Sequence, residues 1–155
     1  PLRRQRQMCI RDRDYAYAQF FTGRQDTGIM DHYRAHLSDG FPGRTLSAVC
    51  VSAAPTRQEA LEQSLMAANF RGSLGTGRPV TFVTASQMDA ETRSLLTSYV
   101  LSNEDTIFVG DYDEVADKLT AFQDAHHVDE LMLISYIDNV QTKVERYRQL
   151  AKRLI

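Results

Sequence analysis

Apolar and polar positions along this chain follow two patterns that alternate from segment to segment, one typical of strands and the other typical of helices. Short unbroken apolar runs suit strands covered on both faces, and segments with apolar residues three and four positions apart suit helices packed on one side. The pattern predicts strands over about residues 15–21, 45–53 and 128–134, and a shorter apolar run over 107–109. It predicts helices over about residues 29–37, 56–68, 87–101, 111–126 and 138–151.

Three of the predicted helices begin with a capping box, in which a side-chain oxygen and an acid or amide three residues later satisfy free backbone N–H groups. The pairs are Thr56 with Glu59, Asp111 with Glu114, and Asp138 with Gln141. The spacing of apolar residues then predicts the buried side of each helix. The expected inner stripes are Leu61, Leu65 and Ala68; Val115, Leu119 and Phe122; and Val140, Val144, Tyr147 and Ala151, with Lys143, Arg146, Arg148 and Lys152 outside.

The order of these elements predicts the fold class. Strands alternate with helices and no hairpin signal separates them, so we expect an α/β protein with a parallel sheet, either doubly wound or part of a (β/α)8 TIM barrel. About three βα units are visible, whereas a complete barrel takes roughly 250 residues. The periodicity lapses between Arg71 and Ile107, and such an insertion usually forms a lid or binding loop. Its glycine-rich part, residues 71–79, is expected to be a flexible loop.

The first 13 residues stand apart because they carry five Arg and one Asp. Such a basic arm could bind nucleic acid or anionic lipid. Residue for residue, however, the segment resembles the in-frame translation of a transposase adapter used to make sequencing libraries, so we expect residues 1–13 to be an artefact without a structural role. The genuine domain is expected over residues 14–155. Without the +4 of the first segment, the chain's net charge of −2 becomes −6, which argues against nucleic acid as a partner.

The composition narrows the class of protein further. Hydrophobic residues make up 43% of the chain, enough for the core of a globular domain. No apolar run approaches the roughly 20 residues that span a bilayer, and no segment resembles a signal peptide, so we expect a cytoplasmic protein without a membrane partner. Two cysteines exclude a disulfide framework. Cys50 is expected to pack as a small hydrophobe inside a strand.

The chain offers no nucleophile with an adjacent base, so no catalytic residue is predicted. The cluster Gly72–Gly77 lacks the lysine of a phosphate-binding P-loop, which leaves a phosphate contact by Arg71 or Arg78 as the alternative to a plain loop. Parallel barrels bind ligands at the carboxyl ends of their strands. The residues at the predicted strand ends are Gln19, Phe20, Phe21, Thr22, Ser52, Ala53, Ser135 and Tyr136. For the two phenylalanines, core packing is as well supported as contact with a flat aromatic ligand.

Titratable groups elsewhere in the chain are interpreted as structural. His126 and His127 are expected to close the helix that begins at Asp111, where a protonated imidazole would interact favourably with the helix dipole. Neither this pair nor the histidines at positions 32 and 36 has the partners of a metal site, so no metal is predicted. The Asp129–Glu130 pair lies at the entrance of its strand, opposite the expected ligand side, and is expected to form a turn.

In order and spacing, these segments resemble the C-terminal part of the bacterial luciferase-like flavin-dependent monooxygenase family over about residues 14–155. Residues 15–21 are similar to the sixth barrel strand of the family. Residues 108–115, with Phe-Val-Gly before Asp-Glu-Val, are similar to a helix start of the family, and residues 128–133 to its final strand. Residues 71–109 resemble the variable lid after strand seven. The resemblance implies that this chain is the C-terminal part of a (β/α)8 barrel with a lid insertion.

The resemblance also implies an activity. Such a barrel would bind reduced FMN and use O2 to oxidise a small organic substrate, while a flavin reductase supplies the reduced cofactor. The implied cofactor contacts are Gln19, Phe20, Arg71 and Arg78, and the implied substrate or lid contacts are Phe21, Thr22, Gly75 and Gly77. The family's catalytic strands precede this segment, so the piece alone is expected to be inactive.

Two further expectations concern the state of the protein and the competing functions. Three strands of a barrel leave sheet edges and an apolar face unpaired, so the isolated chain should self-associate, and the full-length protein is expected to be a homo-oligomer. One alternative is a hydride-transfer enzyme of the same barrel superfamily that uses the deazaflavin coenzyme F420. The other is a small non-enzymatic α/β binding module.

Overall fold

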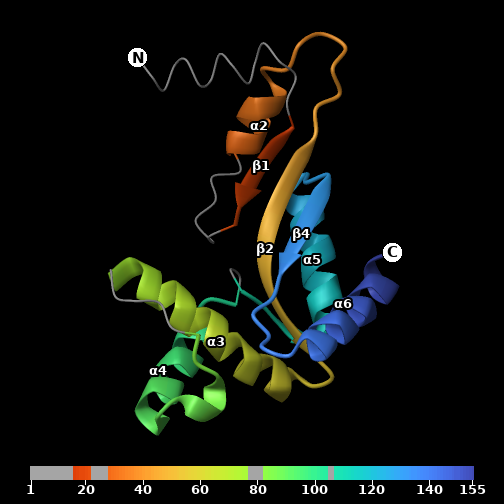
Figure 1. Ribbon diagram of the computed structural model, residues 1–155. Coiled ribbons are helices and arrows are strands. Elements are labelled where there is room, and N and C mark those ends of the chain that lie inside the picture. The colour runs from red at the N-terminus through yellow and green to blue at the C-terminus, as the bar shows by residue number, and fades with distance from the viewer. Residues whose placement is uncertain (1–15, 22–27, 77–81, 105–106) are drawn as a thin grey trace.

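The computed structural model describes residues 16–21, 28–76, 82–104 and 107–155 (Figure 1). Within these ranges strands and helices alternate, as the sequence pattern predicts. In chain order the elements are β1 (Tyr17–Phe20), α2 (Gly28–Arg34), β2 (Thr45–Ala54), α3 (Arg57–Thr76), the 3-10 helix η1 (Ala85–Gln87), α4 (Ala90–Leu101), β3 (Phe108–Asp111), α5 (Tyr112–His126), β4 (Glu130–Ile134) and α6 (Val140–Leu154).

The sheet is organised around β2, which Figure 1 shows as a long strand between β1 and β4. The first half of β2 pairs with both of these strands: β1 aligns with residues 45–48 and β4 with residues 46–50. Its last four residues, 51–54, pair with β3. All three pairings are parallel, which confirms the predicted parallel α/β class.

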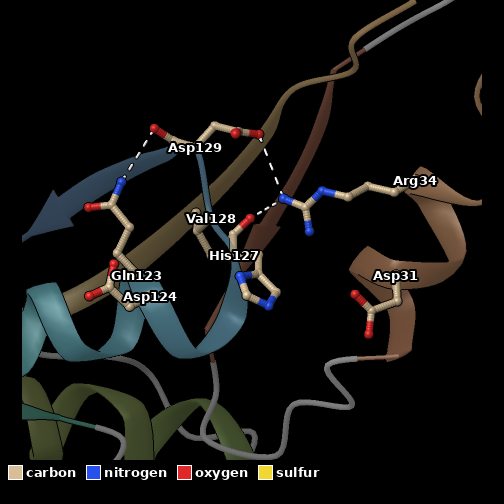
Figure 2. A pocket seen from close by; sticks show the side chains of 7 residues that line it. All are labelled: Asp31, Arg34, Gln123, Asp124, His127, Val128 and Asp129. Atoms are coloured by element: carbon tan, nitrogen blue, oxygen red, sulfur yellow. Dashed lines mark hydrogen bonds and ion pairs between the residues drawn. The ribbon is translucent and has the colours of Figure 1, made fainter.

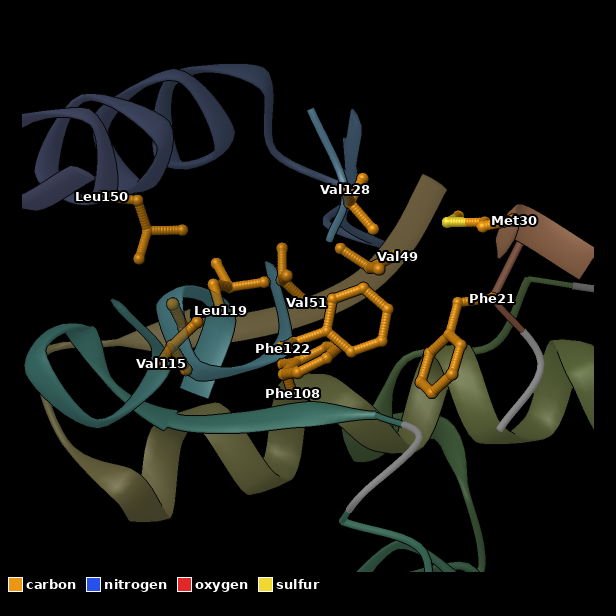
Figure 3. Close-up of a cluster of buried hydrophobic side chains, with 11 residues drawn as sticks. Phe21, Met30, Val49, Val51, Phe108, Val115, Leu119, Phe122, Val128 and Leu150 are labelled. Carbon is orange, nitrogen blue, oxygen red and sulfur yellow. The ribbon is translucent and has the colours of Figure 1, made fainter. Parts of the chain in front are cut away.

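The two faces of β2 are covered by different helices. Side chains alternate between the faces of a strand, and Val49, Val51 and Ala53 all lie in the main core, shown in Figure 3. Helices α5 and α6 contribute to this core with Val115, Leu119, Phe122 and Leu150. Ala54, on the opposite face, belongs to a second cluster built from α3, α4 and β3. The carboxyl half of β2 is therefore buried on both sides.

Strand β4 is covered on one face only, so the predicted burial of both its faces was wrong. Leu131 and Leu133 pack against the main core, whereas Met132 is 51% exposed. Met132 aligns with Ala48, which in turn aligns with Phe20 of β1, and Phe20 is 43% exposed. No described helix covers this row of apolar side chains, because α5 and α6 lie on the other face.

Helix α5 forms as its sequence predicts. The Asp111 carboxylate accepts hydrogen bonds from the backbone N–H groups of Asp113 and Glu114 at 3.0 and 2.9 Å. The Glu114 carboxylate accepts from the Asp111 N–H at 3.0 Å, which completes the capping box. At the other end His127 adopts the left-handed conformation, with φ of 51°. The start of α3 is also confirmed, since the Glu59 N–H donates to the Thr56 hydroxyl.

The last helix departs from its prediction. Asn139, not Asp138, caps α6 by accepting from the Thr142 N–H at 2.9 Å; both residue types serve well at this position. The predicted inner stripe is only partly right: Tyr147 is half-buried and its hydroxyl donates to the Leu133 carbonyl, but Val140 is 68% exposed and Leu150 is the buried apolar residue. The face of α6 that packs against the sheet is therefore set by Leu150 rather than by Val140 and Val144.

Helix α3 extends further than predicted. It runs to Thr76, so residues 71–76 are helical rather than part of a flexible loop, while residues 77–79 lie outside the described ranges. Glycine weakens a helix by roughly 1 kcal/mol, yet packing of Leu65 and Ala68 against the second cluster holds the preceding turns. Tertiary packing has overridden the local preference.

Replacing Gly72 with alanine should stabilise the protein. Gly72 is helical, and a Cβ built on it meets nothing within 4 Å, so the free energy of unfolding should rise by about 0.5–1 kcal/mol in urea titrations. Gly43→Ala is the matched control. Its φ is +68° and a Cβ there would approach Leu37 to 2.5 Å, so that variant should be less stable. Equal effects of the two variants would contradict this account.

His126 packs into the core instead of facing solvent at the helix end. Its ring lies 4.3 Å from that of Phe122 and 6.2 Å from that of Phe21. Its Nδ1 atom is buried without a hydrogen-bond partner. Burial, followed by the charge of His127, lowers the pKa of His126, so the fold favours the neutral ring. The expected protonated imidazole at this helix end is therefore wrong for His126.

The stability of the protein should fall on mild acidification because of His126. An unfolded chain takes up this proton near the ordinary pKa of about 6.5, and the folded chain only at lower pH. The contribution is therefore fully present above about pH 7 and is lost as the pH falls below that value. Urea unfolding between pH 7.5 and pH 5.5 should show this decline, and His126→Phe should reduce it. An unchanged slope in the variant would exclude His126 as the cause.

Candidate functional site

Polar groups gather at both ends of the sheet, and the two ends differ in how their charged side chains are paired. At the amino ends of β2 and β4, helices α2 and α5 enclose an open pocket (Figure 2). The residues that line it are Asp31, Arg34, Gln123, Asp124, His127, Val128 and Asp129. In a parallel barrel this end is the one associated with stability.

The central contacts of this pocket join β4 to β2. The Asp129 carboxylate accepts from the Thr45 N–H at 2.7 Å and from its hydroxyl at 2.8 Å. The Asp129 N–H donates in return to the Thr45 hydroxyl at 3.1 Å, and Arg34 donates to the His127 carbonyl. The hydrogen bonds from Thr45, above all, lower the pKa of Asp129. The pocket is thus a structural junction, as the predicted turn at Asp129 suggests.

Removing the Asp129 carboxylate should destabilise the fold. Asp129→Ala leaves the N–H of Thr45, a residue with 0% exposure, without its acceptor, which should lower the free energy of unfolding by about 1–2 kcal/mol. Because the pKa of Asp129 is lowered, the wild-type contribution should persist above about pH 4 and disappear as the carboxylate is protonated. Asp124→Ala, on the rim of the same pocket, is the control and should change stability little. Similar losses for both variants would contradict the assignment.

An aromatic group lies at the carboxyl end of the sheet. The rings of Phe70 on α3 and Phe82 are stacked, with centroids 4.9 Å apart and planes 9° apart. Tyr136, two residues beyond β4, lies 5.2 Å from Phe70 and 6.3 Å from Phe82. Phe82 is 60% exposed, so the group is open to solvent on one side. Three segments distant in the sequence thus form one apolar wall.

Cys50 and Arg71 interact electrostatically with each other and with Tyr136 of this wall. Together with the wall they form what we call the carboxyl-end cluster: Cys50, Phe70, Arg71, Phe82 and Tyr136. Burial raises the pKa of the Cys50 thiol, and the Arg71 charge lowers it in part. Burial likewise raises the pKa of the Tyr136 hydroxyl. The interaction with Cys50 raises this pKa further, and the Arg71 charge lowers it in part. The thiol and the hydroxyl therefore stay neutral near pH 7, next to a permanent positive charge.

Arg71 is the unusual member of the cluster. Its Nη1 atom is buried, and it has no hydrogen-bond partner in the described part of the chain. No ion pair involves Arg71 among these residues either, whereas Arg146 donates to the Ala53 carbonyl and lies 3.9 Å from Glu59. Gln63, two turns earlier on α3, also has both amide atoms buried and unpartnered. Buried polar groups are normally satisfied, so Arg71 and Gln63 mark α3 as a candidate for binding a group from outside the described residues.

The sequence-predicted cofactor residues fall in different places. Gln19 lies on the helix-covered face of β1 and accepts a hydrogen bond from the Tyr17 hydroxyl at 3.2 Å. Phe20 points to the opposite face and aligns with Ala48. Cys50 lies on this same face of β2, two residues further along the strand. Arg71 belongs to the carboxyl-end cluster. Arg78 lies outside the described residues.

The predicted substrate and lid residues are also scattered. Phe21 is 5% exposed and its ring lies 4.7 Å from that of Phe122, so it forms part of the core. Gly75 lies within the last turn of α3. Thr22 and Gly77 are outside the described ranges. The structure brings Arg71 and Tyr136 together, whereas Ser135 is buried and donates from its hydroxyl to that of Tyr147.

Sequence reasoning missed three members of the cluster. Phe70 and Phe82 lie on opposite sides of the predicted loop, and no periodicity relates them. Cys50 carried a usable signal, because it occupies the same side of its strand as Ala48, and its register partner Ile134 precedes Tyr136 by two residues. Knowing the strand pairing would have placed Cys50 beside the end of β4.

The described residues meet neither the requirements of a metal site nor those of a membrane-spanning helix. They contain no group of three or more His, Cys, Asp or Glu side chains arranged to hold a metal ion. They also contain no helix long and apolar enough to cross a membrane.

Comparison with known proteins identifies structures of similar fold. The sequence matches no protein-family model and no curated protein. Among solved structures, apo-MsnO8 is similar with a TM-score of 0.62 and 22% identity, over 93% of this chain and 46% of that one. The long-chain alkane monooxygenase LadA is similar with a TM-score of 0.53 and 16% identity, over 90% of this chain and 37% of that one. This chain therefore spans less than half the length of either, and the likeness establishes its fold.

Proposed function

We propose that this chain is the C-terminal part of a (β/α)8 barrel in a flavin-dependent oxidoreductase of the luciferase-like monooxygenase family. The observation that carries the proposal is the fold shared with LadA, a long-chain alkane monooxygenase, over 90% of this chain. The resemblance of residues 14–155 to this family supports it independently. The activity would be oxidation of a small organic substrate with reduced FMN and O2, in the cytoplasm, with a flavin reductase as partner.

The exposed sheet face supports a larger barrel. Phe20 and Met132 are half-exposed on the face opposite α5 and α6. Within the described residues, β1 and β4 each pair with β2 and with no second strand. In a closed barrel further strands would pair with these edges, and the exposed row would face the packed interior. An isolated piece of such a barrel would self-associate and would be inactive.

The residues at the carboxyl end fit a flavin. The buried, unpartnered Nη1 atom of Arg71 suits an anionic group, either of the cofactor or of the substrate. Phe20 offers an exposed ring on the same sheet face to a flat apolar ring system. Gln19, on the other face with Tyr17, would hold β1 in position. Arg78 in the cofactor site, and Thr22 and Gly77 at the lid, remain proposals based on the sequence alone.

This arrangement gives separate roles to the cofactor and to the side chains of the protein. A bound flavin supplies the oxidation chemistry. The chain's own residues would bind and orient: Phe20 contacts the ring system, Arg71 pairs with an anionic group, and the wall of Phe70, Phe82 and Tyr136 excludes water. Neutral Cys50 and Tyr136 would keep that surface free of negative charge.

The proposal is tested by extending the protein upstream. The genomic reading frame before Asp14 should continue through further βα units, and the extended protein should bind reduced FMN more tightly than reduced F420, measured by fluorescence titration. Phe20→Ala should weaken FMN binding by about two- to tenfold, the value of one aromatic contact. Ile29→Ala, which removes an exposed side chain from α2, should leave binding unchanged.

Three outcomes would count against this function. A native start codon close to Asp14 would support a small binding module instead. Preference for F420 over FMN would favour hydride transfer by the same fold. Failure of the extended protein to bind either cofactor would exclude a flavin enzyme.

A further inference from the structure

The strongest unexplained feature of the molecule is the pairing state of Arg71. A guanidinium carries five N–H donors and keeps its charge at any ordinary pH. Here one of its terminal nitrogens is buried and unpartnered, which costs roughly 1–3 kcal/mol. Nothing else in the described part of the chain offsets that cost, because Arg71 makes no ion pair there. An anion from outside these residues would satisfy this nitrogen and balance its charge.

The surroundings of Arg71 restrict the charge of that anion. Arg71 is the one cation that acts on Cys50 and Tyr136 among the described residues. It lies in the C-terminal half of α3, where the free backbone groups of the helix end are carbonyls rather than N–H donors. A phosphate dianion is normally held by several donors or by a helix N-terminus. One guanidinium fork pairs with two oxygens of an anion; a carboxylate has only these two, whereas a phosphate would keep a further oxygen without a donor.

The neighbours of Arg71 restrict the rest of the ligand. The stacked Phe70 and Phe82 rings and the tilted Tyr136 ring form an apolar wall with one open side. The neutral Cys50 thiol and Tyr136 hydroxyl can each donate a hydrogen bond without repelling an anion. An apolar body next to a single carboxylate fits this arrangement.

We propose that Arg71 binds the carboxylate of the organic substrate, and that the apolar body of this substrate lies along Phe70, Phe82 and Tyr136. The inference rests on the proposed function, since it assigns Arg71 to the substrate rather than to the phosphate of the flavin. It names the substrate class as an organic acid with one carboxylate and an apolar body. Gln63, two turns earlier on α3, also has buried amide atoms without partners.

The first test needs no cofactor and no activity. If Arg71 binds a ligand, its unpaired charge destabilises the ligand-free fold. Arg71→Met should therefore raise the urea midpoint of the full 155-residue chain. Arg146→Met is the matched control. Arg146 is bonded to the Ala53 carbonyl and lies near Glu59, so its loss should lower the midpoint. A lowered midpoint for both variants would show that Arg71 is a structural residue and would overturn the proposal.

The second test measures binding with benzoate as the probe and neutral benzamide as its matched analogue. Benzoate should raise the urea midpoint of the wild-type chain, because a ligand that binds only the folded state stabilises it. Benzamide and inorganic phosphate at equal ionic strength should not. Arg71→Met should lower the affinity for benzoate by about tenfold or more. Equal effects of benzoate and benzamide, or no effect of benzoate on the wild type, would overturn the proposal.

Competition with FMN separates this inference from the proposed function. In the extended protein, benzoate should bind with similar affinity whether or not FMN is present. If FMN displaces benzoate and Arg71→Met weakens FMN binding instead, Arg71 belongs to the cofactor; the present inference then fails while the flavin function stands. If no flavin binds but benzoate still requires Arg71, the flavin function fails and the carboxylate site stands.

Discussion

The structure depends on one strand that is paired on its edges and packed on both faces. β2 is ten residues long, and every strand pairing among the described residues involves it. Its odd-numbered side chains pack with α5 and α6, and Ala54 on the other face packs with α3. The orientation of α3 relative to the sheet therefore follows from β2. The carboxyl-end cluster exists because β2 holds Cys50 where α3 presents Arg71.

The two ends of β2 differ in how their charged side chains are paired. We relate the paired amino end to stability and the unpaired carboxyl end to binding. At the amino end Asp129 and Thr45 satisfy each other's polar groups, and Arg44 pairs with Glu130. At the carboxyl end Arg71 and Gln63 keep buried atoms without partners, as do the neutral side chains of Ser47 and His126 nearer the amino end. Local departures from full hydrogen bonding are expected where a protein binds something. The polar group around the amino-end pocket is thus a junction, whereas the carboxyl-end cluster, with its unpartnered Arg71, is the candidate site.

The sequence predicted the features that neighbouring residues determine. It did not predict the features that depend on contacts between distant segments. The Asp111 capping box and the α5 stripe depend on residues a few positions apart, and both formed as predicted. The exposed Met132 face and the buried face of α6 depend on which elements cover the sheet, which periodicity cannot reveal. The end of α3 was missed because glycine content predicts a loop while packing maintains a helix. Of the candidate site, Arg71 and Tyr136 were named from the sequence, but their proximity was not.

The direction of Arg71 is fixed by helix packing rather than by its own contacts. Ala60, Leu65 and Ala68 lie in the second cluster and set the rotation of α3. That rotation turns the same side of the helix, with Arg71 on it, toward Cys50 on β2. The buried, unpaired Nη1 atom costs roughly 1–3 kcal/mol, and the packing of α3 offsets this cost before any ligand is bound. The core thus preorganises the cation, so a ligand need not supply the energy to bury it.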